Sequence, residues 1–321
     1  MSKIIIHAGL HKTGTSAIQK FLHLNRDRLL ELGINYPNTA PFEAHHTLAA
    51  RLCGYSKSEL NLAIKDVNRT MATLKGLSPL STLVISSEML CEGLDPRVFK
   101  YLHKLFDKVE FHFYIRKQSD LIESAYNQQV KQNAESRLIN EYAPYFENIY
   151  KQIKWFEKSV EKSKIITHIY DKALFINLDI IDDFCQKVLN LNLNVEIEIE
   201  KLKSVKTNAS LSIPACLLMT KINKIELDKS TRKEVLKYLT TVLPASEYDN
   251  YKLLSNEDEI QLIERTSINN VLLDEEYVGF AYMSQQVERP LMTMTLEKAL
   301  SIAKEKGIIN EVNKKFKLVI N

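Results

Sequence analysis

The chain has 321 residues, of which 45% are hydrophobic and 26% are charged, an ordinary globular composition that can bury a sizeable core. A net charge of +3 is too small for a dedicated nucleic-acid-binding protein, and four scattered cysteines with no CxxC pair disfavour a zinc site or a disulfide framework. The start, MSKIIIHAGL, lacks a signal-peptide core and no stretch is long enough to span a membrane, so a cytoplasmic protein with reduced thiols is expected.

Short apolar runs rich in β-branched residues alternate with helical patterns over the first two hundred residues. Strands are predicted at 4–9, 82–87, 109–116 and 164–170. Helices are predicted at 16–33, 58–76, 119–132, 147–160 and 180–192. This alternation predicts an α/β fold, with a P-loop-like parallel sheet flanked by helices on both faces. Such sheets bind ligands at the carboxyl ends of their strands.

Beyond about residue 200 the strand signals fade and only helical patterns follow. They begin SLSIPACLLM, TRKEVLKYL, EDEIQLIER and TLEKALSIA. The expected organisation is an α/β core over 1–205 and a helical extension over 206–321, which contributes to the acceptor side or forms a lid.

The segment 9–16, GLHKTGTS, follows the first predicted strand and leads into a helix. Its N–H groups and the positive end of the helix dipole would converge on one point and form a nest for an anion. Gly14 allows backbone angles that other residues resist, and Lys12 adds a full positive charge. Hydroxyl donors follow at Thr13, Thr15 and Ser16. The ATP-binding pattern GxxxxGKS/T is only half matched, because Thr15 rather than a lysine follows Gly14. A hydroxyl-capped helix with a solvated lysine is the alternative, and it explains fewer of these features.

The string HKTGTS resembles the 5′-phosphosulfate-binding loop of sulfotransferases that use 3′-phosphoadenosine 5′-phosphosulfate (PAPS), in the form found in bacterial members that act on carbohydrates and other small acceptors. The resemblance continues through SSEML, IRKQSDLIESAYNQQVK, KWFEKS and VKTNASLS, to about residue 210. It implies that PAPS is the sulfate donor. The loop residues implied to bind it are His11, Lys12, Thr13, Gly14, Thr15 and Ser16.

A second anion site is expected at Arg116 and Ser124. Arg116 ends the predicted strand 109–116, so its guanidinium can donate hydrogen bonds to phosphate oxygens at the carboxyl edge of the sheet. The sulfotransferase family uses an arginine at a strand end and a serine eight residues later to bind the 3′-phosphate, and Arg116 and Ser124 have this separation. A late loop with Lys203 and Lys206 is a weaker candidate for the same phosphate, since a solvated basic turn is the preferred interpretation.

Sulfuryl transfer to a hydroxyl needs positioning, charge stabilisation and a general base. Lys12 is expected to stabilise charge on the leaving oxygen. Two candidates for the base stay open. Glu88 closes the strand 82–87 and is slightly preferred, whereas His46 begins a helix and has a side chain suited to proton transfer at neutral pH. The structural alternatives are a helix cap or ion pair for Glu88 and a single hydrogen bond for His46.

Four other residues are expected outside the site itself: Trp155 and Phe156 in the core, and His7 and His112 either in the core or behind the residues of the site. His7 and His112 lie inside predicted strands. Trp155 and Phe156 lie on the helix 147–160 at core spacing, which favours packing over a role as an adenine platform.

Two other functions stay open beside the sulfotransferase. A P-loop kinase-like phosphotransferase would use ATP with magnesium, and Glu88 could hold the metal. A non-catalytic relative would keep the nucleotide site without the chemistry. The sulfotransferase itself requires no metal, and its expected partner is an acceptor hydroxyl on a small molecule, saccharide or glycan, with no nucleic acid. Acceptor identity and oligomeric state are left unassigned.

Overall fold

The computed structural model describes residues 2–38, 43–53, 82–92, 95–142, 149–160, 164–191, 210–285 and 291–320, with single positions 61, 64, 65 and 68. The chain forms two compact units, each assembled from three segments. The α/β unit comprises Met1–Arg116, Asn148–Ser204 and Ile268–Ser284. The helical unit comprises Lys117–Glu147, Val205–Ser267 and Gln285–Asn321.

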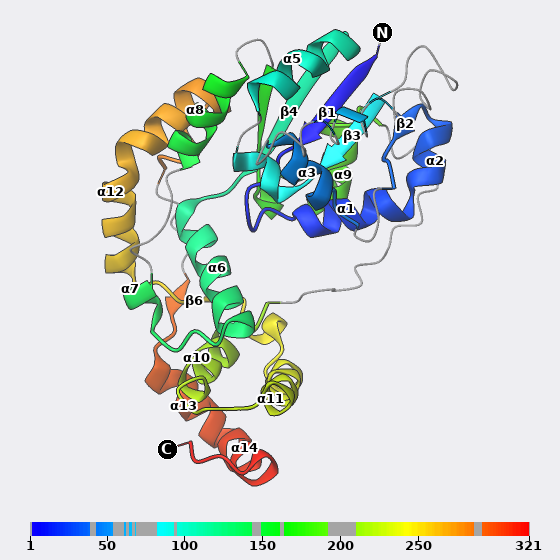
Figure 1. Ribbon diagram of the computed structural model, residues 1–321. Helices are drawn as coiled ribbons and strands as arrows, with labels where there is room; N and C mark the ends of the chain where they lie inside the picture. Colours follow the sequence, from blue (N-terminus) through cyan, green and yellow to red (C-terminus); the bar gives the residue numbers. More distant parts are fainter. Residues whose placement is uncertain are drawn as a thin grey trace. The chain divides into compact units, whose positions relative to one another are not determined.

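A parallel five-stranded sheet forms the centre of the α/β unit, in the order β2-β3-β1-β4-β5 (Figure 1). Its strands are β1 (Lys3–His7), β2 (Ile34–Asn35), β3 (Thr82–Ser86), β4 (Lys108–Ile115) and β5 (Lys164–Ile169). In the central strand β1, Ile4, Ile5 and Ile6 are at most 1% exposed. Such a continuous apolar run is what a strand needs when helices cover both faces of its sheet. Because the strands are parallel, their carboxyl ends meet at one edge.

Helices cover both faces of this sheet. The elements of the unit are α1 (Thr15–Leu24), α2 (Arg26–Glu31), α3 (His46–Leu52), η1 (Glu88–Glu92), α5 (Pro96–Leu105), α8 (Ile149–Ser159), η3 (Lys172–Leu174), η4 (Ile176–Leu178), α9 (Ile180–Lys187) and η6 (Asp274–Val278). On one face, Phe184 of α9 and residues of α1 join Tyr114 of β4 in a buried cluster. On the other, Phe156 of α8 packs edge-on against Phe111 and Phe113, with ring centroids 4.9 and 5.0 Å apart. Because β4 side chains alternate between the two faces of the sheet, this strand packs against the helices on both sides.

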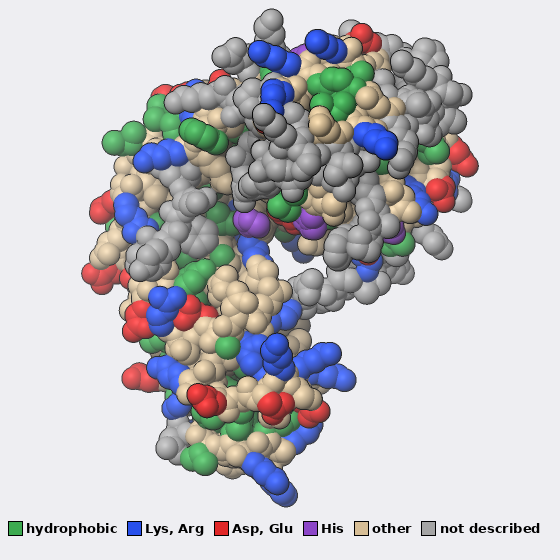
Figure 2. Space-filling model, viewed as in Figure 1, with side chains coloured by type: hydrophobic (Ala, Val, Ile, Leu, Met, Phe, Trp, Pro, Cys, Tyr) green, Lys and Arg blue, Asp and Glu red, His purple; other side chains and the backbone are tan. Residues whose placement is uncertain are grey.

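The helical unit is organised around α10, whose apolar sequence IPACLLMTKI is buried almost all round. The unit contains α6 (Gln118–Gln132), α7 (Ile139–Tyr142), α10 (Ile213–Ile222), α11 (Lys229–Val242), η5 (Ala245–Glu247), α13 (Leu296–Glu305), α14 (Ile308–Phe316) and the short parallel pair β6 (Tyr251–Lys252) and β7 (Met292–Thr293). The long helix α12 (Asn256–Leu273) begins in the helical unit and ends in the α/β unit. Lys and Arg side chains gather on the visible surface of the helical unit (Figure 2).

The predicted fold class is confirmed: the protein is α/β, with a parallel sheet flanked by helices and a helical carboxyl-terminal part. The four predicted strands correspond to β1, β3, β4 and β5, whereas the two-residue β2 was not predicted. The predicted helix 16–33 is two helices that meet at Asn25. The predicted helix 58–76 falls almost wholly outside the described residues.

The core predictions are confirmed in part. His7, His112 and Phe156 are buried, at 0%, 1% and 0% exposure. The prediction for Trp155 is wrong, because its side chain is 65% exposed. Neighbouring residues on a helix point about 100° apart, so α8 cannot direct both Trp155 and Phe156 at the sheet.

The expected organisation had a single boundary near residue 205, whereas each of the two units is assembled from three segments of the chain. The unit does change between 204 and 205, but Lys117–Glu147 belongs to the helical unit and Ile268–Ser284 to the α/β unit. Over the described parts of both units, no helix has the length and apolar content to cross a membrane.

Candidate anion site and proton-transfer group

The anion loop, residues 9–16, has left-handed backbone conformation at two positions. Lys12 has φ 66° and Gly14 has φ 76°. Gly14 is the N-cap residue of α1 and has no side-chain cap. The N–H groups of Thr15 and Ser16 therefore receive no partner from a side-chain cap, whereas the Ala17 N–H donates to the Gly14 carbonyl at 2.9 Å. The loop is braced from inside, because the buried Thr13 donates its hydroxyl to the Leu10 carbonyl at 2.6 Å.

The two glycines of the loop allow close approaches that a side chain would prevent. A Cβ on Gly9 would lie 2.5 Å from Thr15 Oγ1. A Cβ on Gly14 would lie 2.8 Å from Cε2 of Tyr170, the residue that follows β5. Because both glycines lack a Cβ, Thr15 and Tyr170 can pack directly against the backbone of the loop. This packing stabilises the conformation of the loop.

The hydroxyl of Thr15 is an unsatisfied polar group at the start of α1. Thr15 is 3% exposed, and its Oγ1 finds no hydrogen-bond partner among the residues that the structure describes. Buried hydroxyls nearly always have a partner, and leaving one unpaired costs about 1–3 kcal/mol. An oxyanion held by the neighbouring helix N–H groups would supply that partner.

The structure brings Arg116 and Lys12 together at the carboxyl edge of the sheet. Arg116 follows β4, the neighbour of β1, and its Nη1 donates to the Lys12 carbonyl at 3.2 Å. Its guanidinium also lies 5.3 Å from the ring centroid of Tyr170. Tyr170 therefore contacts both halves of the site, Gly14 and Arg116. The sequence interpretation missed it, although its place at the carboxyl end of the predicted strand 164–170 was a usable signal.

The two candidates for the base also lie together. The Nε2 atom of His46 is 3.8 Å from Oε2 of Glu88, and its Nδ1 is 2.9 Å from the hydroxyl oxygen of Ser87. Gln19 of α1 donates its amide to the same Glu88 oxygen at 3.2 Å. Gln19 lies four residues after Thr15, so both occupy one face of α1 about 6 Å apart along its axis. The Glu88–His46 pair is thereby linked to the helix that carries the anion loop.

The remaining predicted site residues lie in different surroundings. His11 and Ser16 are exposed at the surface of the anion loop. Ser124 is half-buried on α6, in the helical unit, and its pairing with Arg116 stays a prediction. Lys203 and Lys206 lie outside the described residues.

Three other histidines, His7, His45 and His168, have pKa values that burial lowers. Burial lowers the pKa of His45 to about 4, and its two ring nitrogens are occupied by the Ser86 N–H at 3.1 Å and the Pro37 carbonyl at 2.8 Å. Burial, with the nearby His112, lowers the pKa of His7 and of His168 to about 3. These low pKa values favour the neutral form of the three side chains at physiological pH.

Metal-ligating side chains do not converge in the described part of the chain: no group of three or more His, Cys, Asp or Glu residues there could hold a metal ion.

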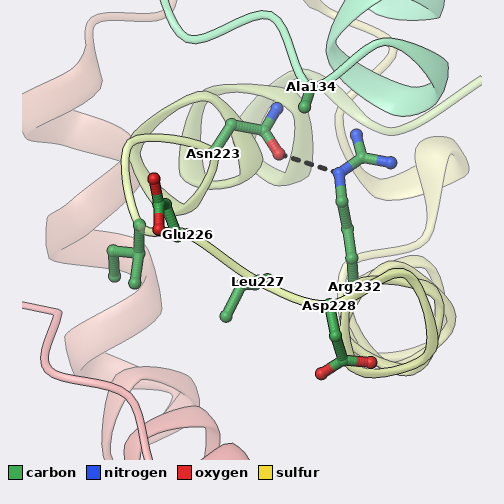
Figure 3. Close-up of a pocket in the computed structure, with 7 residues that line it drawn as sticks. Ala134, Asn223, Glu226, Leu227, Asp228 and Arg232 are labelled. Atoms are coloured by element: carbon green, nitrogen blue, oxygen red, sulfur yellow. Dashed lines mark hydrogen bonds between the residues drawn. The ribbon is translucent and has the colours of Figure 1, made fainter.

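The helical unit has a cavity of about 560 Å³ beside the turn between α10 and α11 (Figure 3). Its lining residues are Ala134, Asn223, Ile225, Glu226, Leu227, Asp228 and Arg232. Arg232 donates Nε to Asn223 Oδ1 at 3.1 Å and Nη2 to the Val130 carbonyl at 2.5 Å. The arginine thus ties α11 to the ends of α6 and α10. Carboxylates and apolar side chains share the wall with it, so the cavity has no clear preference for an anion.

No family model matches the sequence. An uncharacterized protein of Archaeoglobus fulgidus is 26% identical over 246 residues, which cover 71% of this chain and 67% of that protein. This similarity carries no function, so a function has to be argued from the site.

Proposed function

We propose that the protein is a PAPS-dependent sulfotransferase, which moves a sulfuryl group to an acceptor hydroxyl by in-line displacement. The observation that supports this most directly is the hydrogen bond from Arg116 to the Lys12 carbonyl. The two anion-binding motifs come from distant parts of the sequence, and a donor with a phosphosulfate at one end and a 3′-phosphate at the other requires them on one rim.

The residues of the anion loop fit the sulfate end of such a donor. Uncapped helix N–H groups, the unpaired Thr15 hydroxyl and the Lys12 charge offer donors to its oxygens. The donor supplies an activated sulfuryl group whose leaving oxygen becomes a phosphate oxygen. Lys12 stabilises the charge that develops on this oxygen, and the Glu88–His46 pair takes the proton of the acceptor. A glycan or another small hydroxyl compound is the acceptor class that we propose.

Ligand-induced stabilisation tests this proposal and separates it from the kinase. Adenosine 3′,5′-bisphosphate without metal should raise the melting temperature. At a hundredfold excess over its Kd it stabilises the protein by about 2.7 kcal/mol, which corresponds to several degrees. Stabilisation by ATP with magnesium, and none by the bisphosphate, would favour the phosphotransferase. No response to either nucleotide would contradict both functions.

Arg116→Ala should weaken binding of adenosine 3′,5′-bisphosphate by about 2–4 kcal/mol, because a desolvated charged hydrogen bond to the 3′-phosphate is lost. Binding of adenosine 5′-phosphate, which lacks that phosphate, should change much less. Calorimetric titration of both nucleotides measures the difference. Arg137→Ala is the matched control, since Arg137 is an exposed arginine of the helical unit that pairs with Glu135. Equal losses for the two nucleotides would remove Arg116 from the 3′-phosphate site.

A further inference from the structure

The side chain of Ser87 is buried, and its hydroxyl proton has one possible acceptor. The residue is 0% exposed, and the Met89 N–H donates to its Oγ at 3.2 Å. Among the described residues, the only other hydrogen-bond partner of Oγ is His46 Nδ1 at 2.9 Å. If that nitrogen carried the proton, the Ser87 hydroxyl would be enclosed with no acceptor, which is costly. The favourable arrangement has Ser87 donating to an unprotonated Nδ1.

We propose that Ser87 holds His46 as the neutral tautomer protonated at Nε2, and that Glu88 is therefore the general base. The assignment of the base rests on the proposed sulfotransferase function. In this tautomer Nδ1 accepts from Ser87 and Nε2 carries the proton, with Glu88 Oε2 lying 3.8 Å from Nε2, beyond direct hydrogen-bond distance. His46 then has no lone pair for an acceptor proton and acts as a positioning residue.

Glu88 has the arrangement that a base requires. Its Oε2 accepts from Gln19 at 3.2 Å and faces His46, whereas Oε1 makes no hydrogen bond within the described residues. The carboxylate is thus fixed through one oxygen and open at the other. In the transfer step the acceptor oxygen forms a bond to sulfur and its proton passes to Oε1. The bond from sulfur to the bridging oxygen breaks, and its electron pair leaves on adenosine 3′,5′-bisphosphate.

The tautomer can be measured without donor or acceptor. Long-range ¹H–¹⁵N correlation spectra of ¹⁵N-histidine-labelled protein distinguish the two neutral tautomers from the imidazolium. The eight histidines require assignment, and His46→Gln identifies the signals that disappear. Spectra at pH 8.5 lie two units above the ordinary histidine pKa of about 6.5. We expect the Nε2–H pattern in the wild type and in Ser87→Thr, and a measurable population of the Nδ1–H form in Ser87→Ala. An Nδ1–H or doubly protonated His46 in the wild type would overturn the proposal.

Transfer kinetics test the assignment of the base. With labelled PAPS and any acceptor that becomes labelled, Glu88→Gln should lower kcat by about 10²–10⁴-fold, the range of general base catalysis. His46→Gln should lower kcat by only about 10-fold with little change in KM, and Ser87→Thr should restore the rate lost in Ser87→Ala. A loss in His46→Gln as large as that in Glu88→Gln would overturn the assignment. Adenosine 3′,5′-bisphosphate binding is measured in every variant. If the wild type does not bind it, the sulfotransferase and the base role fail together, whereas the tautomer result stands.

Discussion

Lys12 combines the charge that we propose to act in transfer with an unfavourable backbone conformation. Its φ of 66° lies in the left-handed region, which costs a residue with a Cβ about 1–2 kcal/mol. The surrounding contacts hold it there: Thr13 binds the Leu10 carbonyl and Arg116 binds the Lys12 carbonyl. Backbone strain of this kind is common in binding loops, where contacts with neighbouring residues hold the strained conformation in place. The anion loop is therefore shaped before any ligand arrives.

Lys12→Gly should separate stability from function. The glycine relieves the left-handed strain and should raise the free energy of unfolding by about 1 kcal/mol, while the loss of the charge abolishes transfer. Urea denaturation and a transfer assay measure the two effects. Lys317→Gly is the matched control, because Lys317 has φ 54° at the end of α14. It should gain similar stability with full activity, and a loss of stability in Lys12→Gly would contradict the strain argument.

Gly14→Ala should destabilise the protein by about 2–4 kcal/mol, the sum of left-handed strain and of overpacking against Tyr170. Gly279→Ala is the control for left-handed backbone strain without overpacking, because Gly279 has φ 82° and no atom lies within 4 Å of an added Cβ. Urea denaturation of the two variants gives the difference due to crowding, which is against Tyr170 Cε2 at 2.8 Å and, less closely, Ile180 Cγ1 at 3.2 Å. Tyr170→Ala combined with Gly14→Ala should recover part of it, and strictly additive effects would show that the contact is not responsible.

At the scale of elements, a buried carboxylate links α6 to the end of β6. Oε1 of Glu123 on α6 accepts the N–H groups of Leu253 and Leu254 at 2.8 and 2.7 Å. Burial raises the pKa of Glu123 to about 7, against these hydrogen bonds, which lower it. The protonated form is thus favoured by folding. The stability that Glu123 contributes is full below its unfolded pKa of about 4.5 and is lost as the pH rises through 7.

Glu123→Gln should remove this pH dependence. Its amide oxygen can accept the same N–H groups without a charge, so the variant should exceed the wild type by about 3 kcal/mol at pH 8. At pH 4.5 the two proteins should agree closely. Urea denaturation at both pH values measures this, with Glu234→Gln, an exposed glutamate of α11, as the control. An equal difference at both pH values would assign the effect to something other than ionisation.

At the scale of the whole molecule, the α/β unit is completed by a segment from late in the chain. Thr167 of β5 donates its hydroxyl to the Tyr277 carbonyl at 2.5 Å. Tyr282 donates to Asp171 at 2.7 Å, just after β5. Within the segment Ile268–Ser284, these contacts attach the region around η6 to the edge strand of the sheet. Edge strands are commonly covered by a helix or loop, and these two hydrogen bonds place the segment beside β5.

A fragment of residues 1–205 should therefore be less stable than the α/β unit of the intact protein. It retains every strand of the five-stranded sheet but lacks Ile268–Ser284 and the hydrogen bonds that this segment makes to β5. Circular dichroism melting of the fragment should show a transition several degrees lower and less cooperative than that of the full chain. Adding the segment as a separate peptide should raise it, and a fragment that melts like the full protein would contradict this role.

Local patterns in the sequence were sufficient for much of the fold. The β-branched runs at 4–9 and 109–116 predicted buried parallel strands because alternate residues must satisfy two covered faces. The glycine spacing and Lys12 predicted the anion loop because a strand–loop–helix junction exposes N–H groups. Trp155 was placed wrongly because helical spacing alone did not reveal which side of α8 faces the sheet.

Sequence alone determined the four longer strands of the sheet, the anion loop and the residue types of the candidate site, since each depends on a few neighbouring residues. Tertiary structure alone decided that Arg116 and Lys12 share one rim, that Ser87 occupies a ring nitrogen of His46, and that Tyr170 supports Gly14 and Arg116. The physical reason is that these contacts join strands far apart in the chain. Which side chains meet there is set by strand order and by the packing of helices across the sheet.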